Sequence, residues 1–307
     1  MNLVRILGYY LAEGDINQNY RIRFSLGLPG FGHESRIIKD VKNFCNFYNI
    51  HYNEYLNKGS GSQIITVDNS VLAASFKLLL NFGGENAREK RIPSIIYGLP
   101  EKLKLEFLQA YFLGDGSVSE SGISFNTSSE WLAYDLRYLL LQFGISTSIY
   151  TAEKSGKSDK PSWQIIVTGS SDLAKLRKVW QYHHKSNLLN ISAHPKEKKY
   201  ISNKFGNLIQ LPIKEIKKIK PSSRYVYDFS VDGENFIAGN GGICCHNTDY
   251  DLEGEVIGLN VIRFACKKND ADRMKFSTLT KDELIDAYEN RQKHLDWQQA
   301  EAGETRH

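Results

Sequence analysis

The feature that most constrains this chain is an internal repeat. The stretches RILGYYLAEGD (residues 5–15) and EFLQAYFLGDG (residues 106–116) each consist of an apolar, helix-like run that ends in an acid followed by glycine. Aligned on Glu13 and Asp115, the stretches lie 102 residues apart and carry small residues at matching places. These small residues are Gly8 and Ala12 in the first stretch and Ala110 and Gly114 in the second. Such a repeat predicts two structurally similar halves.

The segments that follow each stretch repeat as well. The hydrophobic period changes between 3.6 and 2 residues in the same order in both halves, which indicates alternating helices and strands. The first half has predicted strands at 20–28 and 62–69 and helices at 34–50 and 70–83. The second has predicted strands at 121–129, 146–152 and 162–169 and helices at 130–145 and 171–180. We therefore predict two α/β halves related by a pseudo-twofold axis.

The two acids define a candidate site. Small residues at short intervals allow two helix backbones to approach closely, which would place Glu13 and Asp115 side by side at one end of the seam. Two carboxylates in that position can hold divalent cations that serve phosphodiester hydrolysis. Alternatively, both acids are simply the last residues of core helices, although an acid at a helix C-terminus opposes the helix dipole.

Residues 3–182 resemble the monomeric, two-motif LAGLIDADG homing endonucleases. Gly8 and Ala110 stand at the third-position glycine of the motif, and Glu13 and Asp115 stand at its metal-binding acid. Ile6, at the first position of the motif, is a mild departure. The resemblance implies an α/β (α+β) fold of two αββαββα halves over residues 1–182, and metal-dependent, site-specific cleavage of double-stranded DNA with Mg²⁺ as cofactor.

The same resemblance suggests further residues for catalysis and DNA binding. The block EKRIPSII (residues 89–96) is similar to one that precedes the second motif in the family, so Lys90 is a candidate catalytic base or phosphate contact. The family reads DNA with strand side chains on a concave surface. Alternation places four candidates for this role on outward faces of predicted strands, although each fits an ordinary solvent-facing position as well. They are Arg21, Arg23, Gln164 and Thr168.

The chain changes character from about residue 200, where short β segments at 208–220, 223–233 and 235–247 alternate with glycine-rich turns. The last of these segments ends in His246-Asn247-Thr248. An asparagine can attack its own carbonyl to form a succinimide, and a neighbouring histidine and a following hydroxyl assist the reaction. The tripeptide alone is a weak signal, but it closes a longer stretch of distinctive sequence.

Residues 225–247 resemble the C-terminal splicing blocks of inteins. The resemblance implies that Asp228 assists the junction chemistry, His246 is the penultimate histidine, Asn247 cyclises and Thr248 is the first extein nucleophile. Glu234-Asn235 stands where many inteins have a further histidine, so the chain departs from the pattern at the proton relay. We predict a linker and Hint splicing segment over residues 183–247. Because no N-terminal splicing block precedes the first repeat, we expect an N-terminal intein and extein half in trans, or missing from a fragment.

The final segment is acidic, whereas the rest of the chain is basic. Residues 248–307 contain 9 Lys and Arg against 13 Asp and Glu, and residues 1–247 contain 30 against 22. The stretch TDYDLEGEVIG alternates acids that would form a Mg²⁺ cluster or only a solvated acidic turn. These acids are Asp249, Asp251 and Glu253. Residues 248–307 resemble part of the TOPRIM region of type IA DNA topoisomerases, especially archaeal ones, so we predict a C-extein from such a host.

The composition of the chain excludes some classes of protein but does not indicate a particular function. No run of about 18 apolar residues is present, which predicts no membrane partner and a cytoplasmic protein. The four cysteines fit neither a disulfide framework nor a structural zinc site. Two alternatives stay open. One is a nuclease-dead DNA-binding scaffold in which only junction cleavage is active, and the other is a topoisomerase with a regulatory insertion, which would keep the junction intact.

Overall fold

The computed structural model describes residues 2–17, 20–27, 33–79, 86–152 and 160–193, and beyond them the short stretches 204–205, 208–209, 213, 215–218, 235–239, 242–246, 285–286 and 288–291. The chain divides into two compact units, Met1–Pro212 and Ile213–His307. Within the described ranges, no helix combines the length and the apolar character that a bilayer crossing requires.

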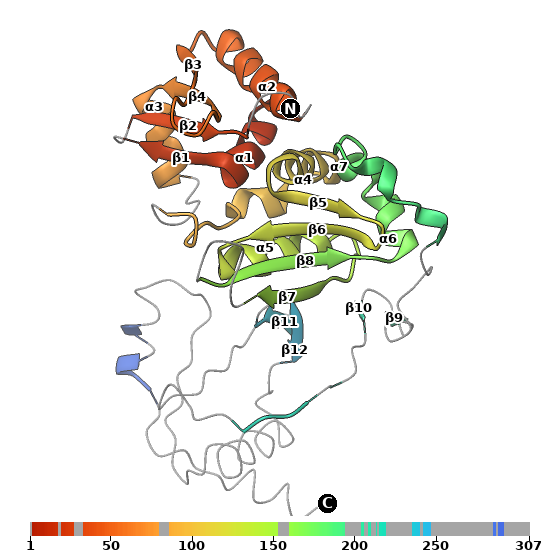
Figure 1. Ribbon diagram of the computed structural model, residues 1–307. Helices are drawn as coiled ribbons and strands as arrows, with labels where there is room; N and C mark the ends of the chain where they lie inside the picture. The colour runs from red at the N-terminus through yellow and green to blue at the C-terminus, as the bar shows by residue number, and fades with distance from the viewer. Residues whose placement is uncertain are drawn as a thin grey trace, which may run out of the picture. The chain divides into compact units, whose positions relative to one another are not determined.

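The first unit begins with an αββαββα half, drawn from red to orange in Figure 1. Its strands form an antiparallel sheet in the order β1-β2-β4-β3. The elements are α1 (Asn2–Glu13), β1 (Gly14–Asn17), β2 (Arg21–Ser25), α2 (His33–Phe47), β3 (Tyr52–Leu56), β4 (Gln63–Asp68) and α3 (Ser70–Ala74), which continues into the π-helical turn η1 (Ser75–Leu79).

A second half repeats this order and follows a 3₁₀ turn, η2 (Ser94–Gly98). Its sheet has the order β5-β6-β8-β7, which is the same topology as the first. The elements are α4 (Glu101–Asp115), β5 (Gly116–Ser119), β6 (Gly122–Thr127), α5 (Glu130–Leu141), β7 (Ser148–Ala152), β8 (Ser162–Val167), α6 (Ser170–Lys175) and α7 (Arg177–Trp180). The turns η3 (Ser186–Leu188) and η4 (Ile191–Ala193) come after it. The two-repeat α/β architecture predicted from the sequence is confirmed.

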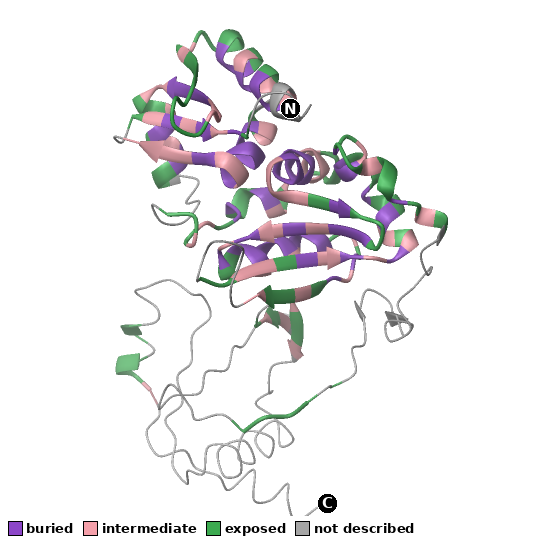
Figure 2. Ribbon diagram, viewed as in Figure 1, coloured by how far each residue is buried: buried purple, intermediate pink, exposed green. Residues whose placement is uncertain are grey.

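Strand register repeats between the halves. Gly14 pairs with Phe24 in the first sheet as Gly116 pairs with Phe125 in the second. The phenylalanines pair in turn with Ile65 and Ile165. Because alternate residues of a strand point to opposite faces, equal register places equivalent side chains on equivalent faces. Buried and partly exposed residues alternate along β2, and along β6 from Ile123 onward (Figure 2).

The periodicity of the sequence does not predict β1, β3 or β5. The strands β1 and β5 are four residues long and begin directly after the acids that end α1 and α4. Four of the five residues of β3 are exposed, because this strand lies at the edge of its sheet. Strands this short or this exposed carry little hydrophobic alternation, which is the signal that periodicity uses.

The helices α2 and α5 end earlier than the predicted limits of 50 and 145. Asn49 has φ of 52° and Gly144 has φ of 65°, so both lie in the left-handed region. The backbone N–H of Ile50 then donates to the carbonyl of Cys45 (2.8 Å), and that of Ile145 donates to the carbonyl of Leu140 (3.2 Å). This pattern is the Schellman type of helix end, in which a residue with positive φ reverses the chain.

The helix α4 lies at the centre of the first unit. Residues 107–113 are buried without a break, so the helix is covered on all sides rather than on one face. In Figures 1 and 2, α1 lies beside α4, and the buried residues of both helices belong to one hydrophobic core that the two halves share. Because α4 is buried on all sides, its sequence is more continuously apolar than the sequence of an amphipathic surface helix.

The described β segments beyond residue 200 are short. In the first unit, β9 (Lys204–Phe205) pairs with β10 (Leu208–Ile209). In the second unit, β11 (Asn235–Ala238) and β12 (Ile243–His246) form an antiparallel hairpin. The prediction of strand over 208–220 is wrong at 213 and 215–218, which form neither helix nor strand. There Ile213 and Ile216 are exposed, so alternation alone did not produce a sheet.

Candidate active site

The candidate site lies where α1 and α4 run closest together. A Cβ atom built on Gly8 would lie 2.6 Å from the carbonyl oxygen of Phe107 and 2.7 Å from Cβ of Ala110. A Cβ on Gly114 would lie 2.7 Å from Cβ of Ala12 and 2.9 Å from Cγ of Glu13. Such distances exclude any larger residue unless a backbone moves. The small residues therefore form the predicted helix seam, and Glu13 lies against the residue that precedes Asp115.

Each helix ends at its acid, and a strand begins at once. Glu13 is the last residue of α1 and Asp115 is the last residue of α4. A Cβ on Gly14 would lie 2.6 Å from Cα of Tyr10, and one on Gly116 would lie 2.2 Å from the carbonyl oxygen of Phe112. The chain turns too sharply against the preceding helical turn for a side chain to fit. The repeated acid-glycine step is thus a local steric requirement, and it holds both carboxylates at the end of the seam.

Asp115 is a strongly perturbed carboxyl group. Burial raises its pKa to about 7, and the negative charge of Glu13 acts in the same direction, whereas Lys90 and Tyr111 lower it. Removal from water disfavours the charged form of an acid, and a like charge nearby adds to that cost. Perturbed groups of this kind are concentrated at functional sites.

Lys90 closes the C-terminal end of α1. Its Nζ donates to the carbonyl oxygens of Leu11 (2.9 Å), Gly14 (2.8 Å) and Tyr10 (3.2 Å). The last carbonyls of a helix lack intrahelical partners and carry the negative end of the dipole, so an ammonium group is favourable there. All three ammonium N–H bonds are used in this arrangement. The part that Lys90 can play here is therefore a fixed positive charge near the acids.

The pKa of Lys90 reflects two opposing effects. Burial lowers it, and the charges of Asp115, Glu13 and Asp15 raise it, with a net decrease from the ordinary value. These couplings show that one ammonium and several carboxylates interact in the same small volume. The structure thus brings together three of the sequence-predicted site residues, Glu13, Asp115 and Lys90.

Two further residues support the site and were missed by sequence reasoning. The Nδ2 of Asn126 donates to the backbone carbonyl of Asp115 (3.0 Å), and the hydroxyl of Tyr111 donates to the carbonyl of Asn126 (2.6 Å). These bonds fix the end of α4 to β6. In the sequence, Asn126 could be recognised only as a residue on the polar face of a predicted strand. That position does not indicate a hydrogen bond to the backbone of Asp115.

The predicted DNA-contacting arginines lie on the partly exposed face of β2, and each is bound to an acid. Arg21 donates from Nε (2.5 Å) and Nη2 (3.1 Å) to the carboxylate of Asp68. Arg23 donates from Nε to Asp15 (2.9 Å). Asp68 and Asp15 were not predicted to take part in this surface. The pairs hold both guanidinium groups in defined positions.

The second sheet has a different outer face. Gln164 is exposed in β8, and Thr168 is half-buried just after that strand. Gln164 lies in register between Asn126 of β6 and Tyr150 of β7. The outer face of the first sheet therefore carries arginine-carboxylate pairs. In the second sheet, the cross-strand neighbours Asn126, Gln164 and Tyr150 are neutral polar residues.

Among the remaining predicted residues, the structure describes only His246, which belongs to the second unit. His246 ends β12, and its backbone lies opposite Asn235 in β11. The others lie outside the described residues, namely Asp228, Asn247, Thr248, Asp249, Asp251 and Glu253. Across the described part of the chain, no group of three or more His, Cys, Asp or Glu side chains is arranged to hold a metal ion.

Comparison with known proteins gives one family and several relatives. The LAGLIDADG-like domain family matches residues 102–181. An uncharacterized protein of Methanocaldococcus jannaschii is 33% identical over 262 residues, which are 80% of this chain and 28% of that protein. Transcription initiation factor IIB of the same organism is 30% identical and matches 80% of this chain and 30% of its own length. A DNA polymerase of Thermococcus litoralis is 29% identical, with 81% and 16% covered.

The chain spans less than a third of the length of each of these relatives. Among solved structures, I-DmoI in complex with DNA and Mn has a TM-score of 0.44 and 11% identity, covering 58% of this chain and 95% of that chain. Full-length DUF199/WhiA from Thermatoga maritima has a TM-score of 0.41 and 18% identity, covering 62% and 59%. The family match extends from α4 to α7, so the second αββαββα half of this chain is similar to a LAGLIDADG-like domain.

Proposed function

We propose that residues 1–182 cleave double-stranded DNA at a specific site by metal-dependent hydrolysis. The observation that carries this proposal is the pair of carboxylates at the end of the helix seam, one of which, Asp115, has a pKa raised to about 7 by burial and by Glu13. Ionising a carboxyl group in such a place is costly unless a cation compensates it. Lys90 supplies one positive charge, and a divalent cation would supply the rest.

The donor set suits a hard cation such as Mg²⁺. Carboxylate oxygens are the ligands that Mg²⁺ prefers, and one or two protein carboxylates with water and phosphate oxygens are a common arrangement. Glu13 and Asp115 would hold the ion in this proposal. When bound, Mg²⁺ supplies an activated water and stabilises the leaving oxygen of a phosphodiester.

The contribution of the chain itself is to hold charges in place. The close seam fixes the two carboxylates relative to each other, and Asn126 fixes the backbone at Asp115. Lys90 keeps its ammonium group at the end of α1, where its charge opposes the negative charge that accumulates on a phosphate. Preorganised charges of this kind need no rearrangement at the moment of reaction.

The proposed DNA surface is the outer face of the two sheets. Arg21 and Arg23 carry guanidinium groups that suit phosphate or guanine, and their carboxylate partners limit the directions in which they point. Gln164 and Thr168 offer amide and hydroxyl groups that suit other base edges. Differing outer faces favour a target whose two half-sites differ in sequence.

Replacing Arg23 by Gln is expected to weaken DNA binding by about 5- to 150-fold, because a charged contact of this kind contributes about 1–3 kcal/mol. Titration of labelled target DNA at several salt concentrations measures both the affinity and the salt slope. The matched control is Arg177→Gln on α7, an exposed arginine outside both sheets, which should leave the affinity unchanged. Equal losses for the two variants would contradict the assignment of this face.

The cleavage test needs no defined target sequence. The purified chain is incubated with Mg²⁺ and a plasmid library that carries a randomised insert, and the ends of linear products are sequenced. A single class of double-strand ends, absent for Glu13→Gln, supports the proposal. Binding of DNA without linear product in Mg²⁺ or Mn²⁺ would contradict cleavage and favour the nuclease-dead DNA-binding scaffold.

We also propose that the chain contains the C-terminal part of an intein. The observation that favours this second function is that proteins with unrelated names share most of this chain. A DNA polymerase, a transcription initiation factor and an uncharacterized protein each match at least 80% of it, although the match is less than a third of their own length. A segment shared by otherwise different proteins is what a mobile insertion produces.

The proposed splicing step takes place at Asn247. Its side-chain nitrogen attacks its own carbonyl carbon, a succinimide forms, and the peptide bond to Thr248 breaks as the amine of Thr248 takes up a proton. His246 would protonate that leaving amine, with Asp228 assisting. Complete splicing would also require an N-terminal splicing segment, either on a separate chain or on a longer polypeptide of which this sequence is a part. Residues 248–307 would then be part of a type IA DNA topoisomerase, with Asp249, Asp251 and Glu253 as Mg²⁺ ligands.

Replacing Asn247 by Ala is expected to abolish cleavage between residues 247 and 248, because alanine has no nucleophilic amide. Intact-mass spectrometry follows the unmodified chain and the variant during incubation, with Asn290→Ala as the matched control. A product that ends at Asn247 and forms in both the unmodified chain and the control supports the intein. An unchanged full-length mass, even after an N-terminal splicing segment is added in trans, would contradict it.

A further inference from the structure

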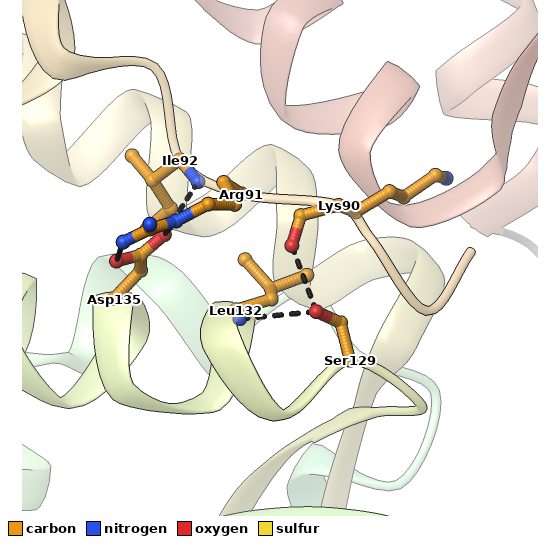
Figure 3. Close-up of polar contacts among 6 residues, drawn as sticks. All are labelled: Lys90, Arg91, Ile92, Ser129, Leu132 and Asp135. Carbon is orange, nitrogen blue, oxygen red and sulfur yellow. Dashed lines mark hydrogen bonds and ion pairs between the residues drawn. The ribbon is translucent and has the colours of Figure 1, made fainter. Parts of the chain in front are cut away.

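The segment 90–92, which leads from the first half to the second, is bound by α5 and its N-cap at three consecutive residues (Figure 3). The carboxylate of Asp135 accepts from Nε (3.1 Å) and Nη2 (2.9 Å) of Arg91 and from the backbone N–H of Ile92 (3.0 Å). The hydroxyl of Ser129 donates to the backbone carbonyl of Lys90 (2.8 Å). The backbone from Lys90 to Ile92 is therefore held in place.

Both groups that hold the segment are themselves fixed. Asp135 is 8% exposed and Ser129 is fully buried. Ser129 is the N-cap of α5, and its hydroxyl oxygen also accepts from the backbone N–H of Leu132 (3.2 Å). Its own N–H donates to the hydroxyl of Thr127 (3.0 Å). Buried polar groups with complete hydrogen bonding are rigid and costly to disturb.

The side chain of Lys90 extends in the opposite direction from its anchored backbone. Figure 3 shows its ammonium group pointing away from Asp135 and Ser129. Nζ reaches the carbonyls of Leu11 and Gly14 at the end of α1. Lys90 thus links α5 of the second half to α1 of the first, and its charge lies next to the seam where the two acids end their helices.

We propose that Asp135 and Ser129 are positioning residues, which place the ammonium of Lys90 at the carboxylate pair by holding the backbone of residues 90–92. The placement of Lys90 does not depend on the cleavage function proposed above, whereas the expected effect on catalysis rests on it. A lysine side chain has considerable rotamer freedom, so its ammonium is placed accurately only if the backbone is fixed. Neither Asp135 nor Ser129 needs to contact DNA or metal to affect the reaction.

The first test measures the placement of Lys90 without any requirement for activity. The full chain is treated with a limiting amine-acetylating reagent, and mass spectrometry follows the labelling rate of each lysine. In Asp135→Asn and Ser129→Ala, the labelling rate of Lys90 relative to the exposed Lys102 is expected to rise roughly tenfold, as the segment opens more often. Ser129→Thr keeps the hydroxyl, and Glu130→Gln changes a neighbouring acid that does not bind the segment, so both should label like the unmodified chain.

Unfolding is separated from local release by the other lysines. If a variant unfolds, Lys42, which pairs with Glu54 in the folded chain, also gains reactivity relative to Lys102, whereas local release affects Lys90 alone. Should Asp135→Asn unfold, the pair Ser129→Ala and Ser129→Thr decides the result, since only the first loses the donor to Lys90. Labelling of Lys90 that stays as slow in Ser129→Ala as in Ser129→Thr would overturn the proposal.

The second test is a double-mutant cycle on DNA cleavage. Asp135→Asn is expected to lower the cleavage rate at saturating DNA by about 10- to 100-fold while the dissociation constant for DNA stays within about twofold. In a Lys90→Met background the same change should have almost no further effect, because both act through one ammonium group. Multiplicative losses would overturn the positioning role. Absence of cleavage by the unmodified chain would instead count against the proposed function, and the labelling result would still stand.

Discussion

Asp115→Asn should reduce the rate of DNA cleavage by about a thousandfold, because several kcal/mol of metal-dependent stabilisation are lost. Asparagine preserves the shape of the side chain and removes the negative charge that would hold a divalent cation. DNA binding should be unchanged or slightly tighter, since one negative charge near the phosphates is removed. Single-turnover cleavage at saturating DNA and Mg²⁺, with a separate binding titration, measures the two effects.

The same substitution should stabilise the metal-free protein above neutral pH. The pKa of Asp115 is raised from 3.8 to about 7 in the folded state, so the folded chain binds this proton more tightly than the unfolded chain does. Its contribution to stability is present below about pH 4 and is lost as the pH rises through about 7. At pH 8, Asp115→Asn should therefore be more stable by a few kcal/mol, and at pH 3.5 by almost nothing. Urea unfolding in EDTA at both pH values measures this difference.

Asp172→Asn on α6 is the matched control, because it makes the same chemical change in a side chain that pairs with Lys175 at the surface. It should cleave DNA at the normal rate and show no pH-dependent gain in stability. Normal cleavage by Asp115→Asn would contradict the metal site. Loss of cleavage without a gain in stability at pH 8 would contradict the raised pKa of Asp115.

Gly8→Ala is expected to destabilise the protein by about 1–3 kcal/mol, because the new methyl group would overlap α4 at a site that cannot expand. The overlap involves the backbone oxygen of Phe107 at 2.6 Å, so the helices must move apart rather than rotate one side chain. Cleavage should also fall by about 100-fold, since a shift of about 1 Å misplaces the two acids. Urea unfolding and single-turnover cleavage measure the two losses.

Gly98→Ala is the control for the loss of a glycine, because a Cβ at Gly98 meets nothing within 4 Å. It should leave both stability and cleavage nearly unchanged. The double variant with Gly8→Ala and Ala110→Gly removes one of the two close contacts and should be more stable than the single effects added together. Additive losses in this cycle would contradict direct contact between the helices at these residues.

The repeated halves and the candidate acids were predictable because their signals are local. The small residues that form the seam recur at fixed distances from Glu13 and Asp115, and the acid-glycine step follows from the sharp turn after each helix. Strand alternation predicted the outer faces that carry Arg23 and Gln164, because a side chain's face depends on its place in the strand. The short strands β1 and β5 were missed because four residues carry too little periodic signal.

The partners of the predicted residues were decided by the tertiary structure. Asp135 lies 44 residues from Arg91, and Lys90 reaches carbonyls 76 or more residues away. No period or spacing in the sequence encodes such contacts, since they exist only when the two halves have packed together. The carboxylate partners Asp15 and Asp68 of the arginines lie within the same half, on β1 and β4, and they were missed because they become neighbours of β2 only when the strands pair.

By itself, the sequence determined that the chain has two similar α/β halves and that each half ends its first helix in an acid. Helix and strand periods, small residues and turn-forming glycines act over a few positions, so they can be recognised along the chain. Only the tertiary structure decided that the surroundings of Asp115 raise its pKa, that Lys90 lies across the end of α1, and that α5 and its N-cap hold the backbone at Lys90. Burial, charge coupling and long-range hydrogen bonds depend on distances in space, which the order of residues does not specify.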